Sequence, residues 1–390
     1  MRVLLVTDWT AEEGGVEVYL ELVAAALRSA GDDVALLTSS AGPADHADYR
    51  AFGTENRAAQ AFLQIANPLA ARDVRRAVAD FRPDVVYVSM FEILLSPAIF
   101  AALRRVRTVL NIAYYKPVCP TGHKLLPDGS ICQVRAGVAC LRNRCLTPPR
   151  WLREQPRYAL IRAAIESVGA IVTCSRFMRT ELARAGVEAA WLPWPIEPPG
   201  PGFAPAPAAT PLFVFTGRLS PEKGVDVLLR AHRLLRDRGT SAQLRVVGDG
   251  PERSRLEALA GSLGLGSTVE FVGRVPREEI ESELAAAWAL VAPSTWAEPL
   301  GLTALEAVVR GVPVVASATG GFTETVQPGV SGLLFRNGDA EALAERLAEV
   351  ASGRIFPGHR ASPAAAAAAL AEHDLDTHAS RLRELMKSPA

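Results

Sequence analysis

The sequence lacks an excess of charge of either sign. Its 42 Lys and Arg residues balance 42 Asp and Glu residues, so the formal net charge at pH 7 is zero. Proteins that bind nucleic acid through the whole chain carry an excess of positive charge. The balance therefore argues against a nucleic acid as the partner.

Long apolar runs are also missing. No segment reaches the roughly 18–20 consecutive apolar residues that a membrane-spanning helix needs. The opening run MRVLLVTD is too short for a secretory signal peptide and is followed by no small-residue cleavage site. We expect a cytoplasmic protein.

Cysteine is scarce, with five residues in a chain of 390, which excludes a disulfide scaffold. Four of them nevertheless fall close together, at Cys119, Cys132, Cys140 and Cys145. Four thiols in so short a stretch of a cytoplasmic chain suit a structural zinc site without an open coordination position. The spacing lacks a C-x2-C pair, so two disulfides or scattered thiols stay as alternatives. Cys174, inside an expected strand, reads as a core residue.

What is present fits an ordinary enzyme of two or three domains, with 49% apolar residues. Short β-branched runs alternate with longer helical stretches, which predicts βαβ units on buried parallel sheets. The expected strands are 2–7, 33–38, 84–89, 108–113 and 170–174 in the first half, and 212–216, 244–247, 269–272, 288–292 and 312–316 in the second.

A Pro- and Ala-rich stretch without periodicity, PPGPGFAPAPAATP, separates the two halves. We predict an N-terminal domain at 1–197 and a linker at 198–210. A C-terminal domain at 211–370 follows, and a helix at 371–390 is expected to pack back on the N-terminal domain. Two α/β domains joined by a hinge imply a ligand cleft between them.

The segment WAEPLGLTALEA at 296–307 carries two carboxylates, Glu298 and Glu306. A helix can begin at Gly301, after the turn made by Pro299. Its first N–H groups, near 300–302, would then form an anion or hydroxyl site at the positive end of the helix dipole. Taken alone, the pattern fits a surface helix equally well.

Upstream, GRLSPEKGVDVL at 217–228 places Arg218 and Lys223 just after the first strand of the second half. The carboxyl ends of strands are where open α/β sheets bind ligands. A guanidinium and an ammonium group there suit a diphosphate. Further glycines follow other strands, among them Gly248.

This set of motifs, over roughly residues 211–351, resembles the nucleotide-sugar half of the family-4 retaining glycosyltransferases, or glycosyl transferases group 1. The resemblance implies an α/β GT-B fold, in which two Rossmann-like domains face each other across a cleft. It also implies transfer of a sugar from a nucleoside-diphosphate donor to an acceptor hydroxyl of a glycan, a glycolipid or a small molecule, without a metal cofactor for the chemistry.

The family's roles can be carried onto matching positions. Arg218 and Lys223 would hold the donor diphosphate and offset the charge of the leaving group, with Glu298 against the transferred sugar as the third catalytic residue. The remaining donor-binding positions implied by the resemblance are Glu306 for the ribose, the backbone of Leu300, Gly301 and Leu302 for the sugar diphosphate, Val275 beside the base, and Gly248.

The first half resembles the family more weakly. Gly14 and Gly15 look like its glycine-rich donor loop, although a plain βα turn is the alternative. Where relatives usually carry a His-Asp pair, this chain reads Ala113-Tyr114-Tyr115-Lys116. One of Tyr114, Tyr115 and Lys116 would have to substitute, or the site would be altered or inactive.

The segment 135–162 is strongly basic, with seven arginines against the single acid Glu154. Such a surface could contact anionic lipid. A solvated helix face and a contact to an anionic acceptor are the alternatives.

The sequence thus predicts a hexosyltransferase-type enzyme that transfers sugar with retention. A nucleotide-sugar epimerase or phosphorylase on the same fold, or a catalytically silent binding subunit, are the competing hypotheses.

Overall fold

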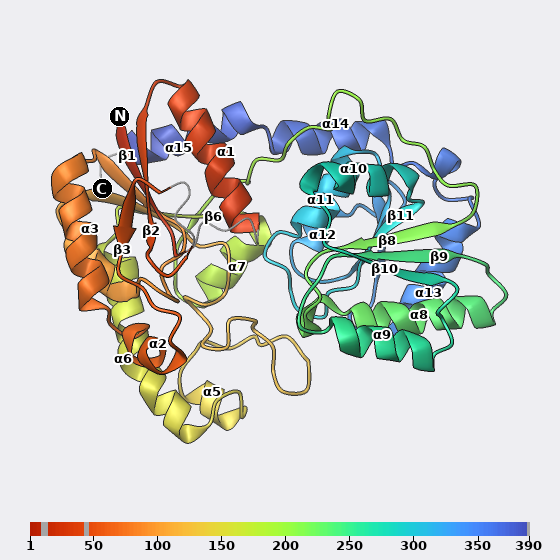
Figure 1. Cartoon of the computed structure of the whole chain (residues 1–390), viewed down its shortest axis with the longest axis horizontal. Coiled ribbons are helices and arrows are strands. Elements are labelled where there is room, and N and C mark those ends of the chain that lie inside the picture. The colour runs from red at the N-terminus through yellow and green to blue at the C-terminus, as the bar shows by residue number, and fades with distance from the viewer. Residues whose placement is uncertain (9–14, 43–46, 388–390) are drawn as a thin grey trace. The chain divides into compact units, whose positions relative to one another are not determined.

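Two parallel sheets organise the chain. The computed structural model describes residues 1–8, 15–42 and 47–387 and divides into two units (Figure 1). Unit 1 comprises Met1–Pro195 with His373–Ala390, and unit 2 comprises Ile196–Glu372. No helix within the described ranges is long and apolar enough to cross a membrane.

The sheet of unit 1 has seven parallel strands in the order β3-β2-β1-β4-β5-β6-β7. The order reverses between β1 and β4, which makes this point of the sheet a switch point where ligands bind in open α/β folds. The strands are β1 (Arg2–Val6), β2 (Asp33–Ser39), β3 (Tyr49–Ala51), β4 (Val85–Val88), β5 (Arg107–Asn111), β6 (Ala170–Thr173) and β7 (Ala190–Trp191).

Helices cover this sheet and explain why its central strands are apolar throughout. They are α1 (Gly15–Ser29), α2 (Arg57–Leu63), α3 (Pro68–Phe81), α4 (Phe100–Leu103), α5 (Val138–Arg142), α6 (Pro148–Ser167), α7 (Arg176–Arg184) and the C-terminal α15 (Leu375–Lys387), with a 3-10 turn η1 (Pro97–Ile99). α3 starts where the sequence provides a cap. The Asn67 side chain accepts a hydrogen bond from the Ala70 N–H, and Pro68 has no backbone N–H that would be left without an acceptor.

The C-terminal helix α15 packs on α1. Tyr19 of α1 stacks on Trp194, and its hydroxyl lies 3.2 Å from His378 Nε2 and 2.6 Å from the Tyr87 hydroxyl. His378 Nδ1 lies 2.7 Å from the Pro193 carbonyl. A buried chain of hydrogen bonds therefore holds α15 in unit 1.

The sheet of unit 2 has six parallel strands in the order β10-β9-β8-β11-β12-β13. They are β8 (Leu212–Thr216), β9 (Gln243–Val247), β10 (Val269–Gly273), β11 (Ala289–Ala292), β12 (Val314–Ser317) and β13 (Gly332–Phe335). Here β8 and β11 are the central pair at which the order reverses.

Unit 2 buries an apolar core on each face of its sheet. Its helices are α8 (Val225–Asp237), α9 (Arg253–Ser262), α10 (Arg277–Ala286), α11 (Leu302–Val309), α12 (Phe322–Thr325), α13 (Ala340–Ala351) and α14 (Pro363–Glu372), with turns η2 (Pro221–Lys223) and η3 (Pro357–His359). The predicted α/β architecture with two Rossmann-like sheets is confirmed, and residues 198–210 contain no helix or strand.

Candidate functional site

Two loops in unit 2, after β8 and after β11, bring two of the predicted charged residues, Lys223 and Glu298, together. Lys223 Nζ lies 2.6 Å from Glu298 Oε1, and Ser294 Oγ donates to the same oxygen at 2.8 Å. Burial alone would raise the pKa of Glu298. The charge of Lys223 and hydrogen bonds from Lys223, Trp296 and Ser294 outweigh that effect and lower it. Glu298 is therefore an ionised carboxylate that positions the ammonium group.

Glycine allows the two loops to approach. Gly224 has φ +65°, and a Cβ there would lie 2.1 Å from the Pro293 carbonyl oxygen. The Thr295 N–H donates to the Glu222 carbonyl at 2.8 Å, and Asn337 Nδ2 donates to the Thr295 carbonyl at 2.8 Å. These contacts fix the loop that carries Lys223 against the loop that carries Glu298.

Arg218 is exposed and lies two residues after the end of β8. The neighbouring Gly248 has φ +135°, and a Cβ there would lie 1.9 Å from the Gly217 carbonyl oxygen. Only glycine lets the ends of β8 and β9 meet so closely, while the donor-binding role of Gly248 stays a prediction.

The helix α11 starts at Leu302, directly after Gly301, as the sequence predicts. Gly301 has φ +81°, and no side chain caps the helix. The first N–H groups of α11 have no partner within the helix, so they can donate to an anion or a hydroxyl group. The Gly321 N–H donates to the Glu298 carbonyl at 2.7 Å and steadies the turn that precedes the helix.

The other predicted residues of unit 2 lie on segments that follow β10 and β11. Leu300 is buried in the turn before α11, while Leu302 and Glu306 are half-buried on α11 itself. Val275 is half-buried after β10 and packs against an apolar core. Unit 2 therefore collects Arg218, Lys223, Gly248, Glu298, Leu300, Gly301, Leu302 and Glu306 on loops and helix starts that follow the carboxyl ends of its strands.

The glycine-rich loop belongs to the other unit. Gly15 is the first residue of α1, and Gly14 lies outside the described residues. The role of both glycines in binding the nucleotide-sugar donor stays a prediction.

In unit 1 the structure reveals a buried cluster that the sequence reading missed. The Asp8 carboxylate, after β1, accepts the N–H groups of Ile93, Leu94 and Leu95 at 2.8, 3.0 and 2.8 Å. The Tyr114 hydroxyl, after β5, donates to Glu92 Oε2. These groups converge at the switch point between β1 and β4.

The arginine of α6 completes this cluster. Arg157 is 1% exposed, donates to the Glu92 carbonyl at 2.7 Å and pairs with Glu154 at 3.1 Å. Burial raises the pKa of Glu92 to about 7, with the Asp8 carboxyl adding to the rise, against the hydrogen bond from Tyr114. Burial also raises the pKa of Asp8. A charged residue inside the apolar run that follows a strand, as in SMFEILL, was the signal that could have revealed Glu92.

The other two residues at the position of the family's His-Asp pair are engaged within unit 1. Tyr115 is fully buried. Lys116 Nζ donates to the Pro120 carbonyl at 3.1 Å, and burial lowers the pKa of Lys116. Tyr114, by contrast, is hydrogen-bonded to an ionisable carboxyl, that of Glu92.

All four clustered cysteines are free thiols and half-buried in the segment before α6, with Cys140 inside α5. Burial raises the pKa of Cys140 and of Cys145, and the neighbouring thiols add to each rise. Within the described ranges, however, no three His, Cys, Asp or Glu side chains are placed to hold a metal ion. The zinc site at Cys119, Cys132, Cys140 and Cys145 stays a prediction. Cys174 is buried in the core, as expected.

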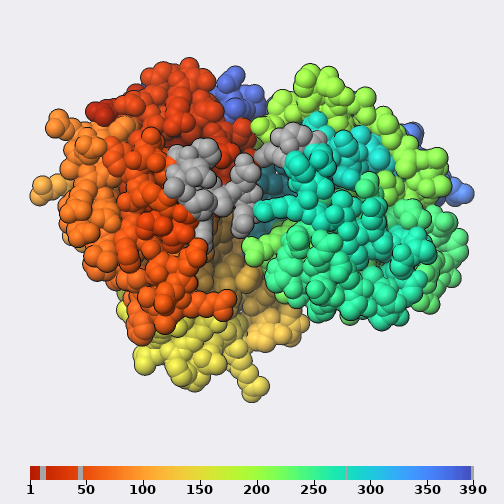
Figure 2. Space-filling model, in the orientation of Figure 1, coloured from red at the N-terminus to blue at the C-terminus, as the bar shows by residue number. Residues whose placement is uncertain are grey.

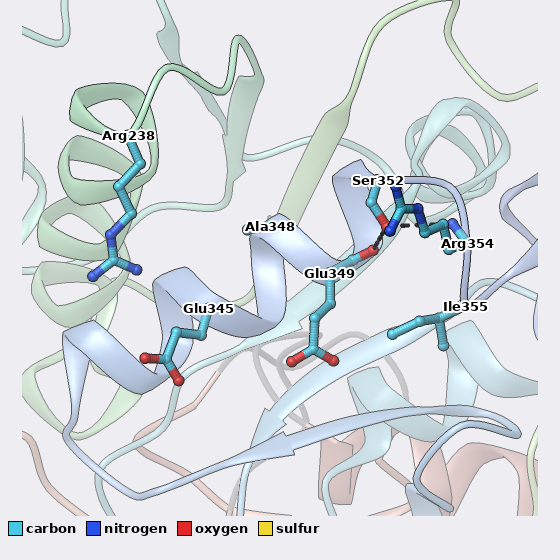
Figure 3. Close-up of a pocket in the computed structure, with 7 residues that line it drawn as sticks. All are labelled: Arg238, Glu345, Ala348, Glu349, Ser352, Arg354 and Ile355. Atoms are coloured by element: carbon cyan, nitrogen blue, oxygen red, sulfur yellow. Dashed lines mark hydrogen bonds between the residues drawn. The ribbon is translucent and has the colours of Figure 1, made fainter.

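A surface cavity of about 570 Å³ lies elsewhere in unit 2, along α13. Figure 3 shows its seven lining residues: Arg238, Glu345, Ala348, Glu349, Ser352, Arg354 and Ile355. None of the predicted site residues lines it. The cavity is thus separate from the Lys223–Glu298 centre.

Comparison with known families matches both halves of the chain. A model described as "Glycosyl transferases group 1" matches residues 203–368, and one described as "Glycosyl transferase 4-like domain" matches residues 14–192.

Among curated proteins, the chain is similar to a D-inositol 3-phosphate glycosyltransferase of Corynebacterium jeikeium, at 39% identity over 43% of this chain and 44% of that protein. It is also similar to a GDP-mannose-dependent alpha-(1-6)-phosphatidylinositol monomannoside mannosyltransferase of Mycolicibacterium smegmatis, at 34% identity over 47% of this chain and 54% of that protein. The chain thus aligns with only about half the length of these relatives.

Solved structures resemble the fold over nearly the whole chain. Sucrose-phosphate synthase from Thermosynechococcus elongatus has a TM-score of 0.76 at 22% identity, and covers 99% of this chain and 98% of its own. Anabaena HepE, in complex with UDP and glucose, has a TM-score of 0.69 at 22% identity and full coverage of both chains. At such identities the likeness concerns the fold alone.

Proposed function

Because the chain belongs to the group 1 glycosyltransferases, we propose that it transfers a sugar from a nucleoside-diphosphate donor to an acceptor hydroxyl, with retention of the anomeric configuration. The observation that carries this proposal is the Lys223–Glu298 pair in unit 2, with α11 starting directly after the same loop. The names of the similar curated proteins, which include a glycosyltransferase and a mannosyltransferase, support the reaction class.

The donor diphosphate would bind to the cationic side of this centre. A lysine has three N–H donors, and one of those on Lys223 is directed at Glu298. The remaining donors, the exposed guanidinium of Arg218 and the first amides of α11 can bind phosphate oxygens. The structural neighbour in complex with UDP and glucose is consistent with such a donor.

The same groups would assist the departure of the nucleoside diphosphate. Negative charge develops on the leaving oxygen as the bond to the sugar breaks, and fixed cations there stabilise the transition state. Glu298 keeps Lys223 in position, and it would accept hydrogen bonds from hydroxyls of the transferred sugar. Glu306, further along α11, would accept them from the ribose.

The acceptor would be a glycan, a glycolipid or a small molecule, attacking through a hydroxyl group from the side of the leaving group. The similar curated proteins are named for inositol 3-phosphate and for a phosphatidylinositol mannoside, which are hydroxyl-rich acceptors. A cytoplasmic location and a peripheral membrane contact through the basic segment 135–162 are parts of the same proposal.

A donor screen tests the proposal. Purified protein is heated with UDP-, GDP-, ADP- and dTDP-sugars, and we expect one nucleotide to raise the melting temperature. A ligand at 100 times its Kd adds roughly 2.7 kcal/mol of stability. Release of the nucleoside diphosphate with an acceptor, and an unchanged anomeric configuration in the product by NMR, would complete the assignment.

The competing hypotheses give different results in the same experiment. An epimerase would convert the donor without releasing a nucleoside diphosphate, and a phosphorylase would require inorganic phosphate. A silent subunit would bind the nucleotide sugar without turnover. Inversion of the configuration would contradict the proposed mechanism while leaving the family intact.

A further inference from the structure

The loop that follows β13 reaches the loop that carries Glu298. Asn337 lies two residues after the end of β13, and its Nδ2 donates to the Thr295 carbonyl at 2.8 Å across 42 positions of the chain. Both residues lie outside the two predicted motif segments, 217–228 and 296–307. Figure 2 shows unit 2, whose colours run from green to blue, with green and blue-green segments forming most of the face in view. The contact therefore adds a third loop to the two that form the predicted centre.

Thr295 joins this third loop to the turn before Lys223. Its N–H donates to the Glu222 carbonyl at 2.8 Å, and its Oγ1 donates to the same oxygen at 3.3 Å. Its Cγ2 lies against Gly224, where a Cβ would be 3.2 Å away. The backbone and the side chain of Thr295 therefore both hold the segment after β8.

These contacts lie close to the ion pair along the chain. Glu222 directly precedes Lys223, and Thr295 lies three residues before Glu298. Lys223 Nζ and Glu298 Oε1 are 2.6 Å apart, and that distance depends on how the two backbone segments are held. The chain of hydrogen bonds from Asn337 through Thr295 to Glu222 therefore sets the geometry of the pair.

Stability alone does not explain an asparagine at position 337. The residue is half-buried, and its Oδ1 is buried without a hydrogen-bond partner among the described residues. A buried acceptor without a donor destabilises the folded state. A leucine has nearly the same size and would avoid this cost. The amide contributes one thing that leucine cannot, the hydrogen bond to the Thr295 carbonyl.

We propose that Asn337 and Thr295 are positioning residues, which hold Lys223 against Glu298 in the orientation that the leaving diphosphate requires. The inference rests on the proposed function, and it adds residues that would contact neither the donor nor the acceptor. A fixed cation stabilises a transition state best when it needs no rearrangement as the charge develops. A displacement of about 1 Å can lower a rate by about 10²-fold. Small changes in the relative position of the two loops should therefore affect the chemical step.

The amide can be removed without leaving a cavity. Asn337→Leu should lower the turnover number for nucleoside-diphosphate release by about tenfold, and change the Kd of the nucleoside diphosphate by less than about threefold. Its melting temperature should equal or exceed that of the wild type, because the unpartnered oxygen is gone. The probe is whichever of UDP, GDP, ADP and dTDP the wild type binds, with its glucose or mannose derivative as donor and water as acceptor.

Two threonines of unit 2 give a matched pair of variants. Thr295→Val removes the hydroxyl that donates to Glu222 and should lower turnover by about fivefold. Thr295→Ser, which keeps the hydroxyl, should lose less activity than Thr295→Val. Thr268→Val removes a hydroxyl that donates to the Leu265 carbonyl at 3.2 Å, directly before β10, and should leave turnover unchanged.

A double-mutant cycle separates positioning from a general structural role. If Asn337 acts through Lys223, Lys223→Ala/Asn337→Leu should turn over within about twofold of Lys223→Ala alone. Two independent defects would multiply instead, and the double variant would then be about tenfold slower than Lys223→Ala.

Three results would overturn the inference while leaving the proposed function intact. The first is an Asn337→Leu variant with the turnover of the wild type. The second is a fall of turnover in Thr268→Val as large as that in Thr295→Val. The third is a cycle in which the two defects multiply. A wild type that neither binds any of the four nucleotides nor releases one would instead contradict the proposed function, and this inference with it.

Discussion

The two units place a buried glutamate after a central strand of their sheets and give it opposite partners. Glu298 in unit 2 meets the ammonium group of Lys223, and its pKa is lowered. Glu92 in unit 1 meets the phenol of Tyr114, and burial raises its pKa to about 7. Burial acts in the same direction on both carboxyls, so the partner decides which one is ionised.

This difference matches what each unit would have to bind. Unit 2 is arranged around fixed charges, as a site for an anionic diphosphate requires. Unit 1 holds a carboxyl with a pKa of about 7 beside a phenol that keeps its proton, because burial raises the pKa of Tyr114 well above its usual range; such surroundings permit a site for neutral hydroxyl groups. The contrast teaches that one neighbouring side chain can decide whether a buried glutamate is ionised, even when the two glutamates follow similar sheets.

Removing the cation from unit 2 should give the largest effect. Lys223→Ala should lower turnover by about 10²–10³-fold, because it removes a fixed charge from the developing diphosphate. Steady-state kinetics of nucleoside-diphosphate release measures this. Arg230→Ala, at an exposed arginine of α8 paired with Asp226, is the control and should keep its activity. Equal activity of both variants would end the proposed role of Lys223.

Removing the carboxyl from unit 1 should change stability in a pH-dependent way. The folded-state pKa of Glu92 is raised from 4.5 to about 7, so the folded state binds more protons, and the wild type loses stability as the pH rises through this range. Glu92→Gln should not suffer this loss, which amounts to about 3 kcal/mol. Hydrogen exchange of the amides of β1 and β4 reports unit 1 separately. A constant difference between variant and wild type from pH 4.5 to pH 7 would contradict the account.

His378 in the same unit should show the opposite sign. Burial lowers its pKa from 6.5 to about 4, so the unfolded state binds more protons between these values, and stability falls as the pH falls from 6.5 to 4. His378→Gln should lose this dependence, again about 3 kcal/mol, as well as the contact to Tyr19. The same exchange measurement on β5 and α15 checks it. A variant that still loses stability on acidification as the wild type does would show that His378 is not the responsible group.

Metal binding at the cysteine-containing segment 119–145 of unit 1 should not change donor binding in unit 2. It is therefore the smallest effect that we expect on donor binding. If Cys119, Cys132, Cys140 and Cys145 bind metal, elemental analysis should find about one zinc per chain. Chelation should loosen this loop of unit 1 without changing the nucleotide affinity of unit 2. Metal-free protein with four freely reacting thiols would refute the site, and thiols that react only after reduction would indicate disulfides.

Much of the fold could be predicted because buried parallel strands are continuous apolar runs. The run at 212–216 coincides with β8, and the start of α11 follows from Gly301. Three strands were missed: β7 and β3 are too short to show a pattern, and the four-residue β13 was not expected as a strand either. The motif residues of unit 2 were found because they stand in two recognisable segments, 217–228 and 296–307, that follow β8 and β11.

The cluster in unit 1 could not be predicted in the same way. Asp8, Glu92 and Tyr114 follow three different strands, and only the strand order brings them together. Nor could the outer face of α6 be predicted, because helical periodicity tells which residues share a face but not which face is buried. Arg157 was counted among the surface arginines of 135–162, yet it is buried against Glu154.

Calorimetric titration of nucleoside diphosphates tests the central claim most directly, that unit 2 binds the diphosphate of the donor through fixed cations. UDP, GDP, ADP and dTDP are titrated into the wild type, Arg218→Ala and Glu306→Ala. One of them should bind the wild type, and each variant should bind it about 10- to 150-fold more weakly, as expected when a hydrogen bond to a charged group is lost. No binding to the wild type, or equal affinity in Arg218→Ala, would contradict the claim.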